Sequence, residues 1–160
     1  MSRDLEPLPH APISMVMGLL EHLREAPAGR EDLYKLGAPL GYELDDLLPV
    51  TEAAKLLGLA RVESGDIWLT DEGHALAQAE EPERKRRLRL RLATLPLLAE
   101  IRAALDAGGG RAAKGPVVER LQAGFSPGEA ERQLATAMAW ARYGELFDFD
   151  PDADEFFVSE

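Results

Sequence analysis

The chain has 160 residues, of which 46% are hydrophobic and 29% are charged, and its formal net charge at pH 7 is −11. This composition is typical of one ordinary globular domain or two small ones, and no apolar run approaches the roughly 18 to 20 residues of a membrane-spanning helix. Cysteine is absent, which excludes disulfides, thiolate metal sites and cysteine nucleophiles. The N-terminus shows no basic segment followed by an apolar core, so we expect a cytoplasmic protein.

The charge is distributed unevenly along the chain. Residues 1–83 carry a net charge of −11, residues 84–142 carry +7, and residues 143–160 carry −7. Nucleic-acid binders gain most of their sequence-independent affinity by neutralising phosphates with lysine and arginine. The acidic first half is therefore poorly suited to that task, and only the middle of the chain carries the net positive charge that would attract an anion.

Three helices are predicted in the first part of the chain. Prolines near the N-terminus place the start of the first helix near Ile13, and a break at residues 27–29 separates it from a short second helix over about residues 30–36. For the third helix, Asp46 as the N-cap puts Pro49 in the first turn, where its missing N–H has no intrahelical carbonyl to lose.

The third helix leads into a predicted hairpin. Spacings of three and four put one apolar face of the helix in the core, namely Leu47, Val50, Ala53, Ala54 and Leu57. Gly58 then ends the helix, and two short strands over residues 59–63 and 66–70 are joined by Ser64 and Gly65. Thr70 or Asp71 caps one more helix. A helix, a glycine stop and a hairpin in this order are typical of a winged helix, with the hairpin as its wing.

Arginine and leucine alternate over residues 87–92, a period that fits a strand as well as a helix. We favour a helix because these are straight-chain helix formers, because β-branched residues are absent from this run, and because Leu88, Leu92 and Leu95 also fit helical spacing. Pro96 ends or kinks this helix, and residues 97–105 continue as the first helix of a second unit.

The second unit repeats the order of the first. A glycine loop at residues 108–110 precedes a short helix over residues 116–121, and Ser126 with Glu129 predicts the capped start of a long helix that runs to Tyr143. A second hairpin follows, in which Leu146, Phe147 and Phe149 pair with Phe156 and Val158 across the acidic turn. The sequence thus predicts a mainly α protein with small β-hairpins (α+β), built as tandem winged-helix domains. The first domain covers residues 8–82, and residues 83–160 hold a basic linker helix plus the second.

Three segments carry a resemblance to a known family: LPHAPISMVMGLLEHL, LGYELDDLLPVTEAAKLLGLARVESGDIWLTDEGHALA and SPGEAERQLATAMAWARYGELFDFDPDADEFFV. Together they resemble the AAA-associated C-terminal domain, an extension behind the ATPase module of nitrate, sulfonate and taurine type ABC importers. The resemblance implies a cytoplasmic regulatory or interaction module without catalytic residues to transfer. We expect no ATPase module within these residues, because the nearest candidate loop, GGGRAAKG from Gly108, lacks the spacing and the hydroxyl residue of a phosphate-binding loop.

The strongest candidate site is a run of six cations within eight residues: Arg84, Lys85, Arg86, Arg87, Arg89 and Arg91. Such a run can contact nucleic-acid phosphates, an acidic partner or a membrane surface. The alternative that we favour is an arginine-rich helix paired with the chain's own acidic first unit or acidic tail, because those segments are covalently close and compete with any external anion.

The predicted third helices supply candidate interaction surfaces. In the first unit the residues expected to face outward are Asp45, Thr51, Glu52 and Lys55, and in the second they are Glu129, Arg132, Gln133 and Thr136. Two carboxylates on the first face would repel phosphates, so direct reading of the DNA major groove by this unit is not favoured. Phe157 is a further candidate, because adjacent Phe156 and Phe157 cannot both face inward on one strand.

The acidic residues from Asp148 to Glu155 alternate as calcium ligands do. The run lacks the glycine at the sixth position and the glutamate at the twelfth, so a polar turn is the better interpretation. We expect no metal, no cofactor and no enzymatic activity. The first hypothesis is a regulatory module that binds a transporter ATPase or a copy of itself as a homodimer. The second is a transcriptional regulator that binds DNA through residues 84–91.

Overall fold

The computed structural model describes residues 5–158, and its contacts divide the chain into two compact units. The N-terminal unit is Pro9–Arg87, and the C-terminal unit combines residues 5–8 with residues 88–158 of the described range. The protein is mainly helical with two small antiparallel sheets, which confirms the α+β class. The contacts change from one unit to the other inside helix α5 (Glu83–Leu92), whereas the sequence placed the boundary before residue 83. None of the helices in the described part of the chain combines the length and the apolar character needed to cross a membrane.

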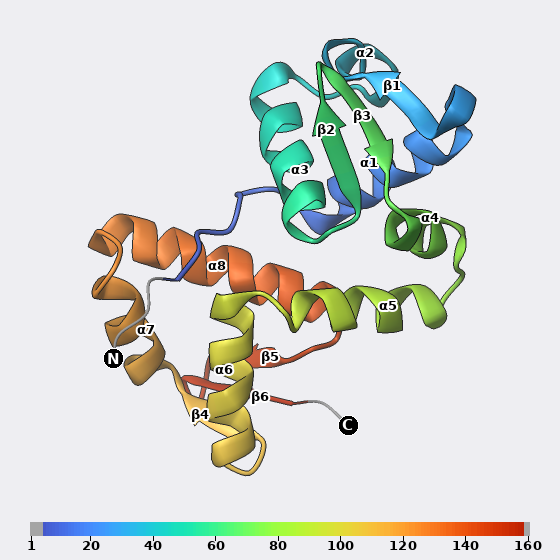
Figure 1. Cartoon of the computed structure of the whole chain (residues 1–160). Coiled ribbons are helices and arrows are strands. Elements are labelled where there is room, and N and C mark those ends of the chain that lie inside the picture. The colour runs from blue at the N-terminus through green and yellow to red at the C-terminus, as the bar shows by residue number, and fades with distance from the viewer. Residues whose placement is uncertain (1–4, 159–160) are drawn as a thin grey trace. The chain divides into compact units, whose positions relative to one another are not determined.

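The N-terminal unit contains one three-stranded sheet with helices packed beside it (Figure 1). Its elements are α1 (Ile13–Glu25), η1 (Pro27–Gly29), β1 (Arg30–Asp32), η2 (Leu33–Lys35), α2 (Gly37–Leu40), α3 (Leu44–Leu56), β2 (Ala60–Glu63), β3 (Asp66–Leu69) and α4 (Asp71–Gln78). The strand order is β1-β3-β2, with β3 in the centre and antiparallel to both neighbours. Helix α1 packs against α3 and α4.

The predicted hairpin and its flanking helix ends are confirmed. Ser64 and Gly65 have φ angles of 53° and 82°, and two positive φ angles in a two-residue loop define the turn that suits the twist of a hairpin. Gly58, at φ 75°, ends α3. The hydroxyl of Thr70 accepts a hydrogen bond from the N–H of Gly73 at 3.0 Å and so caps α4.

The helix predicted over residues 30–36 is wrong. This segment forms strand β1 followed by the short turn η2. Arg30 lies opposite Trp68 in the sheet, with its guanidinium 4.4 Å from the centroid of the indole ring, and its Nε donates to Asp66 at 3.1 Å. These cross-strand contacts, which join residues far apart in the sequence, stabilise the strand over a helix of two turns.

The predicted start of α3 is also wrong. The N-cap is Glu43 rather than Asp46, so Pro49 lies inside the helix. The bond that a proline removes is the one to the carbonyl four residues earlier, here that of Asp45. Asp45 is exposed, so water can hydrate the carbonyl that Pro49 leaves without a partner. The helix can therefore begin earlier than the proline suggested.

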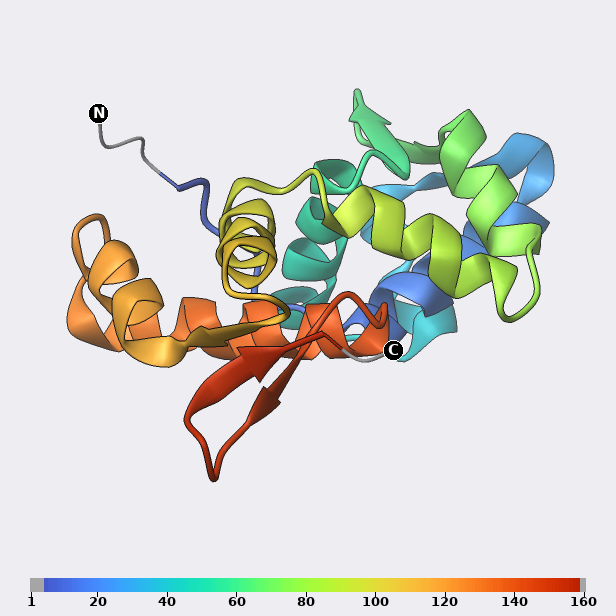
Figure 2. The same ribbon diagram turned by 90° about the horizontal axis from the view of Figure 1, so that it is seen from below.

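The C-terminal unit has the same order of elements after α5. They are α6 (Pro96–Ala107), β4 (Arg111–Ala113), α7 (Lys114–Gln122), α8 (Pro127–Tyr143), β5 (Asp148–Asp150) and β6 (Glu155–Phe157), with the strand order β4-β6-β5. Figure 2 shows the projecting hairpin of β5 and β6. Strand β4 was not predicted, whereas the helical state of α5 and the serine cap of α8 are confirmed, the latter by a bond of 3.3 Å from the N–H of Glu129 to the hydroxyl of Ser126.

A buried glutamine ties the start of the chain to α8. Gln133, predicted to face outward, has only 1% of its surface exposed. Its Oε1 accepts a hydrogen bond from the backbone N–H of Leu8 at 2.7 Å, and its Nε2 donates to the backbone carbonyl of Leu8 at 3.0 Å. Gln133 thus satisfies both polar backbone groups of Leu8, itself a buried residue.

Replacing Gln133 tests this attachment. Gln133→Ala leaves the N–H and the carbonyl of a buried residue unpaired, so we expect the free energy of unfolding to fall by about 2 kcal/mol. Urea unfolding of the full chain measures the loss. Gln122→Ala, which changes an exposed glutamine on α7, is the control. Equal stability of the two variants would contradict the role assigned to Gln133.

Candidate functional site

The cations of α5 lie against parts of their own chain, and Arg84 shows this at the end of α4. Its Nη2 donates to the carbonyl of Ala77 at 2.7 Å and its Nε to the carbonyl of Ala79 at 3.1 Å. Its Nη1 lies 3.3 Å from Oε1 of Glu21 on α1. The last carbonyls of a helix have no partner within it, and cations are favoured there by the helix dipole. Arg84 therefore acts as a C-terminal cap of α4.

Arg89 performs the same task at the end of α8. Its Nε donates to the carbonyl of Gly144 at 2.9 Å, and its Nη2 lies 3.5 Å from Oε1 of Glu145. Gly144 permits this close approach, because a Cβ atom there would stand 2.6 Å from Cδ1 of Leu92. The glycine that the sequence marked as the stop of α8 is thus also a position where α5 packs tightly against that helix end.

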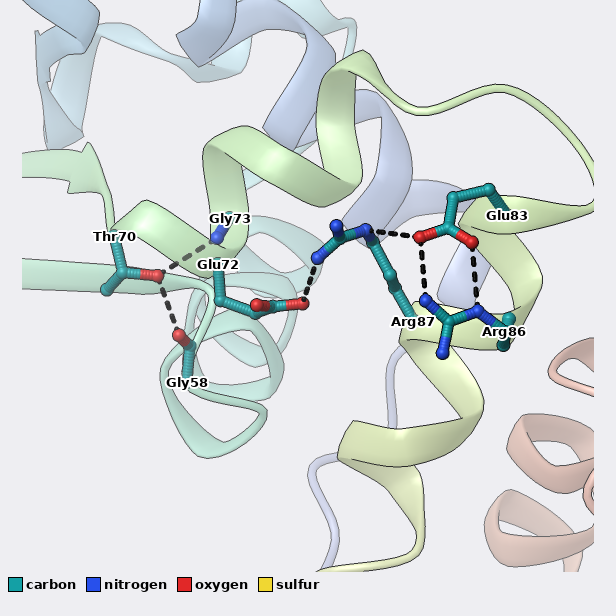
Figure 3. A network of polar contacts seen from close by, with 7 residues as sticks. All are labelled: Gly58, Thr70, Glu72, Gly73, Glu83, Arg86 and Arg87. Atoms are coloured by element: carbon teal, nitrogen blue, oxygen red, sulfur yellow. Dashed lines mark hydrogen bonds and ion pairs between the residues drawn. The ribbon is translucent and has the colours of Figure 1, made fainter.

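Glu83 holds two arginines of the same helix, as Figure 3 shows. Arg86 donates to both carboxylate oxygens of Glu83 at 2.9 Å, and the Nε of Arg87 lies 2.8 Å from the second of them. The other end of Arg87 reaches Glu72 on α4 at 3.4 Å. The paired hydrogen bonds from Arg86 hold the pKa of the Glu83 carboxyl below its ordinary value, and they raise the pKa of Arg86.

The remaining members of the run are Lys85 and Arg91, which are half-buried, and each has an interaction of its own. The structure therefore brings the predicted cations together on one helix and directs them largely to carbonyls and carboxylates of this chain. In the acidic tail, Glu145 pairs with Arg89 of this run. The other tail carboxylates pair outside the run: Arg111 bonds Asp150 and Glu155, at 3.1 and 2.8 Å, and Arg142 bonds Asp148 at 2.7 Å.

The outward face of α3 differs from its prediction in two ways. Asp45, Glu52 and Lys55 are exposed as predicted, and Lys55 pairs with Glu52 at 3.3 Å. Thr51 was expected to be exposed but is 3% exposed, because it lies four residues after Leu47 and three before Ala54, on the buried side of the helix. The sequence reasoning did not single out Leu44 and Leu48, which are exposed. Their spacing, which lies off the stripe of core residues, was the available signal.

Phe157 lies beneath an arginine of the neighbouring strand, as Trp68 does in the first sheet. Phe156 is fully buried and Phe157 is half-buried, in agreement with the alternation expected on one strand. The guanidinium of Arg111, opposite Phe157 in the sheet, lies 5.6 Å from its ring centroid. Arg30 is placed in the same way over Trp68 in the N-terminal unit. Phe157 is thus partly covered by an arginine rather than fully free for a partner.

The acidic turn of the second hairpin is held by its own backbone. The carboxylate of Asp150 accepts from the N–H groups of Asp152 and Ala153 at 3.0 and 3.3 Å. The backbone bond from Ala153 contributes most to lowering the pKa of Asp150, and Arg111 lowers it further. Within residues 5–158, histidine and carboxylate side chains form no group of three or more that could hold a metal ion.

An open groove of about 540 Å³ lies between α7 and α8. Its lining is largely apolar, with Val118, Leu134 and Met138 among its residues, and its charged lining residues are Lys114 and Glu131. The groove therefore offers a mainly apolar surface for packing.

Comparison with known proteins identifies the family. The family model for the C-terminal AAA-associated domain matches residues 34–150, and the chain belongs to this family. No curated protein matches the chain. Among solved structures, CalO1, a methyltransferase in calicheamicin biosynthesis in its SAH-bound form, aligns with 21% identity over 81% of this chain and 39% of its own, at a TM-score of 0.38.

The cap on α8 can be tested by replacing Arg89, the side chain that donates to it. Arg89→Met keeps the apolar stem but removes the guanidinium from the carbonyl of Gly144, so we expect stability to fall by about 1 kcal/mol. Thermal or urea unfolding measures this loss. Arg132→Met is the matched control, because Arg132 is 66% exposed and pairs with Glu129 on its own helix. A loss no larger than that of the control would refute the cap.

Glu83 predicts a dependence of stability on pH. Its pKa is lowered in the folded state, so its contribution is complete above the ordinary value of 4.5 and disappears as the pH falls through the folded value. Glu83→Gln should therefore be less stable than wild type at neutral pH, and the difference should shrink in acid below 4.5. Urea unfolding of both proteins from neutral pH into acid measures this difference in stability, with Glu119→Gln as the control. A difference that does not change with pH would be inconsistent with the pairing.

Proposed function

We propose that the chain is a non-enzymatic, cytoplasmic regulatory module of two winged-helix units that binds another protein, namely the ATP-binding subunit of an ABC-type importer. Family membership supports the type of partner. The module is not expected to hydrolyse ATP through a phosphate-binding loop, because its glycine-rich stretch at residues 108–110 leads into strand β4 and does not match such a loop.

The repeated architecture supports the winged-helix interpretation. Each unit contains a helix, a strand, shorter and longer helices, and a hairpin, in that order. In each sheet the last strand of the hairpin lies in the centre, between the first strand and its hairpin partner. The hairpins β2–β3 and β5–β6 then correspond to the wings, and α3 and α8 correspond to the recognition helices of DNA-binding relatives of this fold.

The observation that carries the proposal is the state of the arginine-rich helix. Arg84 and Arg89 cap the ends of α4 and α8, and Arg86 and Arg87 share Glu83. Cations bound in this way are costly to redirect to phosphates. The face of α3 that a DNA reader would use carries Asp45 and Glu52, which repel a phosphate backbone. Contact with a protein surface is compatible with both features.

Co-purification tests the proposal. The full chain, tagged and expressed with the ATP-binding and permease subunits of an ABC-type importer from the same source, is expected to retain the ATP-binding subunit through washing at physiological salt. An unrelated acidic winged-helix protein with the same tag is the control. Loss of the ATP-binding subunit at that step would argue against the proposed partner.

The competing hypothesis is DNA binding through residues 84–91. Here we expect no retention of random duplex at low salt, and no change when Arg86 and Arg87 are both replaced by glutamate. Retention that falls with salt and disappears in the double variant would replace the proposal with a transcriptional role. Sedimentation of the same samples reports whether the chain is a homodimer.

A further inference from the structure

Two leucines on α3 are exposed without a structural reason. Among the described residues the large hydrophobic side chains with high exposure are Tyr34, Leu44, Leu48 and Leu90. Leu44 is 56% exposed and Leu48 is 45% exposed. Residues four apart lie on the same side of a helix, one turn from each other. They therefore form one apolar patch on α3, the teal helix of Figure 1.

The opposite face of α3 is already packed. Leu47, Val50, Ala53 and Ala54 are buried to 2% exposure or less. The helix therefore has its full core contact without the two leucines, and exposing them to water is unfavourable. Neither leucine caps the helix or fills a space in the N-terminal unit. A pair of such residues on adjacent turns is the kind of patch that marks contact with another molecule.

The charges around the patch define what can cover it. Asp45 and Glu52 lie within one turn of the leucines, and both are exposed. We call Leu44, Asp45, Leu48 and Glu52 together the α3 ridge. Carboxylates in the first turn are also favoured by the helix dipole, which gives Asp45 a second reason to be there. Glu52 lies two turns further along the helix, where it pairs with Lys55 at 3.3 Å.

The acidic character of the α3 ridge excludes several occupants. Phosphates of nucleic acid and anionic lipid headgroups are repelled by Asp45 and Glu52. A second copy of the chain would have to supply cations, and its arginine-rich helix is largely engaged, with Arg84 and Arg89 at helix ends. A protein partner with an apolar groove flanked by lysine or arginine would match both the leucines and the carboxylates of the ridge.

The geometry points to the α3 ridge as a docking surface for a basic, apolar protein surface, into which Leu44 and Leu48 insert while Asp45, together with Glu52 in exchange for its exposed pair with Lys55, contacts the partner's cations. This inference rests on the proposed function and specifies the chemistry of that partner. The apolar contact supplies affinity, and the charges orient the partner and speed its approach.

The test uses the full chain and two synthetic helical peptides. Both peptides present leucines at positions i and i+4, which are bordered by lysines in one peptide and by glutamates in the other. We expect the lysine peptide to bind, to weaken as salt is raised, and to protect α3 in hydrogen exchange. The glutamate peptide should not bind. Fluorescence anisotropy measures both affinities.

Matched variants separate docking from folding. Leu44→Gln with Leu48→Gln should weaken binding of the lysine peptide by about tenfold or more, because two buried leucine contacts are lost. Its melting temperature should match that of wild type, since both positions are exposed and glutamine is a good helix former. Leu90→Gln is the control, because Leu90 is 58% exposed and lies on α5. It should bind as wild type does.

Several outcomes would overturn the inference. They are no binding of the lysine peptide to wild type, equal binding of the glutamate peptide, or unchanged affinity in the double leucine variant. Self-association that disappears in this variant would assign the ridge to a second copy. If wild type retains the ATP-binding subunit and the double variant does so equally well, the inference fails while the proposed function stands. If wild type does not retain that subunit, the proposed function itself fails.

Discussion

Helix ends impose the constraint on which both units depend. The last carbonyls of α4 and α8 lack partners within their helices, and arginines of α5 supply them. Because Arg84 belongs to the N-terminal unit and Arg89 to the C-terminal unit, one short helix completes an element in each. A run of cations that resembles a nucleic-acid contact in the sequence thus has a structural task in both units.

An arginine also has an equivalent structural role in each of the two sheets. Arg30 and Arg111 each begin an edge strand, lie over the aromatic residue opposite, and pair with an acid of the hairpin. The residues differ, with tryptophan in one unit and phenylalanine in the other, yet the arrangement is equivalent. Cross-strand contacts of this kind hold short edge strands of three residues, which would be marginal alone.

The burial of polar residues on helices was the feature hardest to predict from the sequence. Thr51 and Gln133 were both expected in water because their side chains are polar, and both are buried. Gln133 is satisfied by the backbone of Leu8, a partner that is 125 positions away in the sequence. The exposed leucines of α3 show the converse, because they are hydrophobic side chains that the folded unit leaves in contact with solvent. Helical periodicity identifies the core face, but it cannot show what the other face meets.

The sequence by itself determined the elements that depend on neighbours along the chain. These include the turn at Ser64 and Gly65, the caps at Thr70 and Ser126, and the helical state of the arginine-rich run, because their energies come from residues a few positions apart. The tertiary structure decided the rest. Strands β1 and β4 exist because a distant hairpin pairs with them, and the arginines point to helix ends that only folding brings within reach.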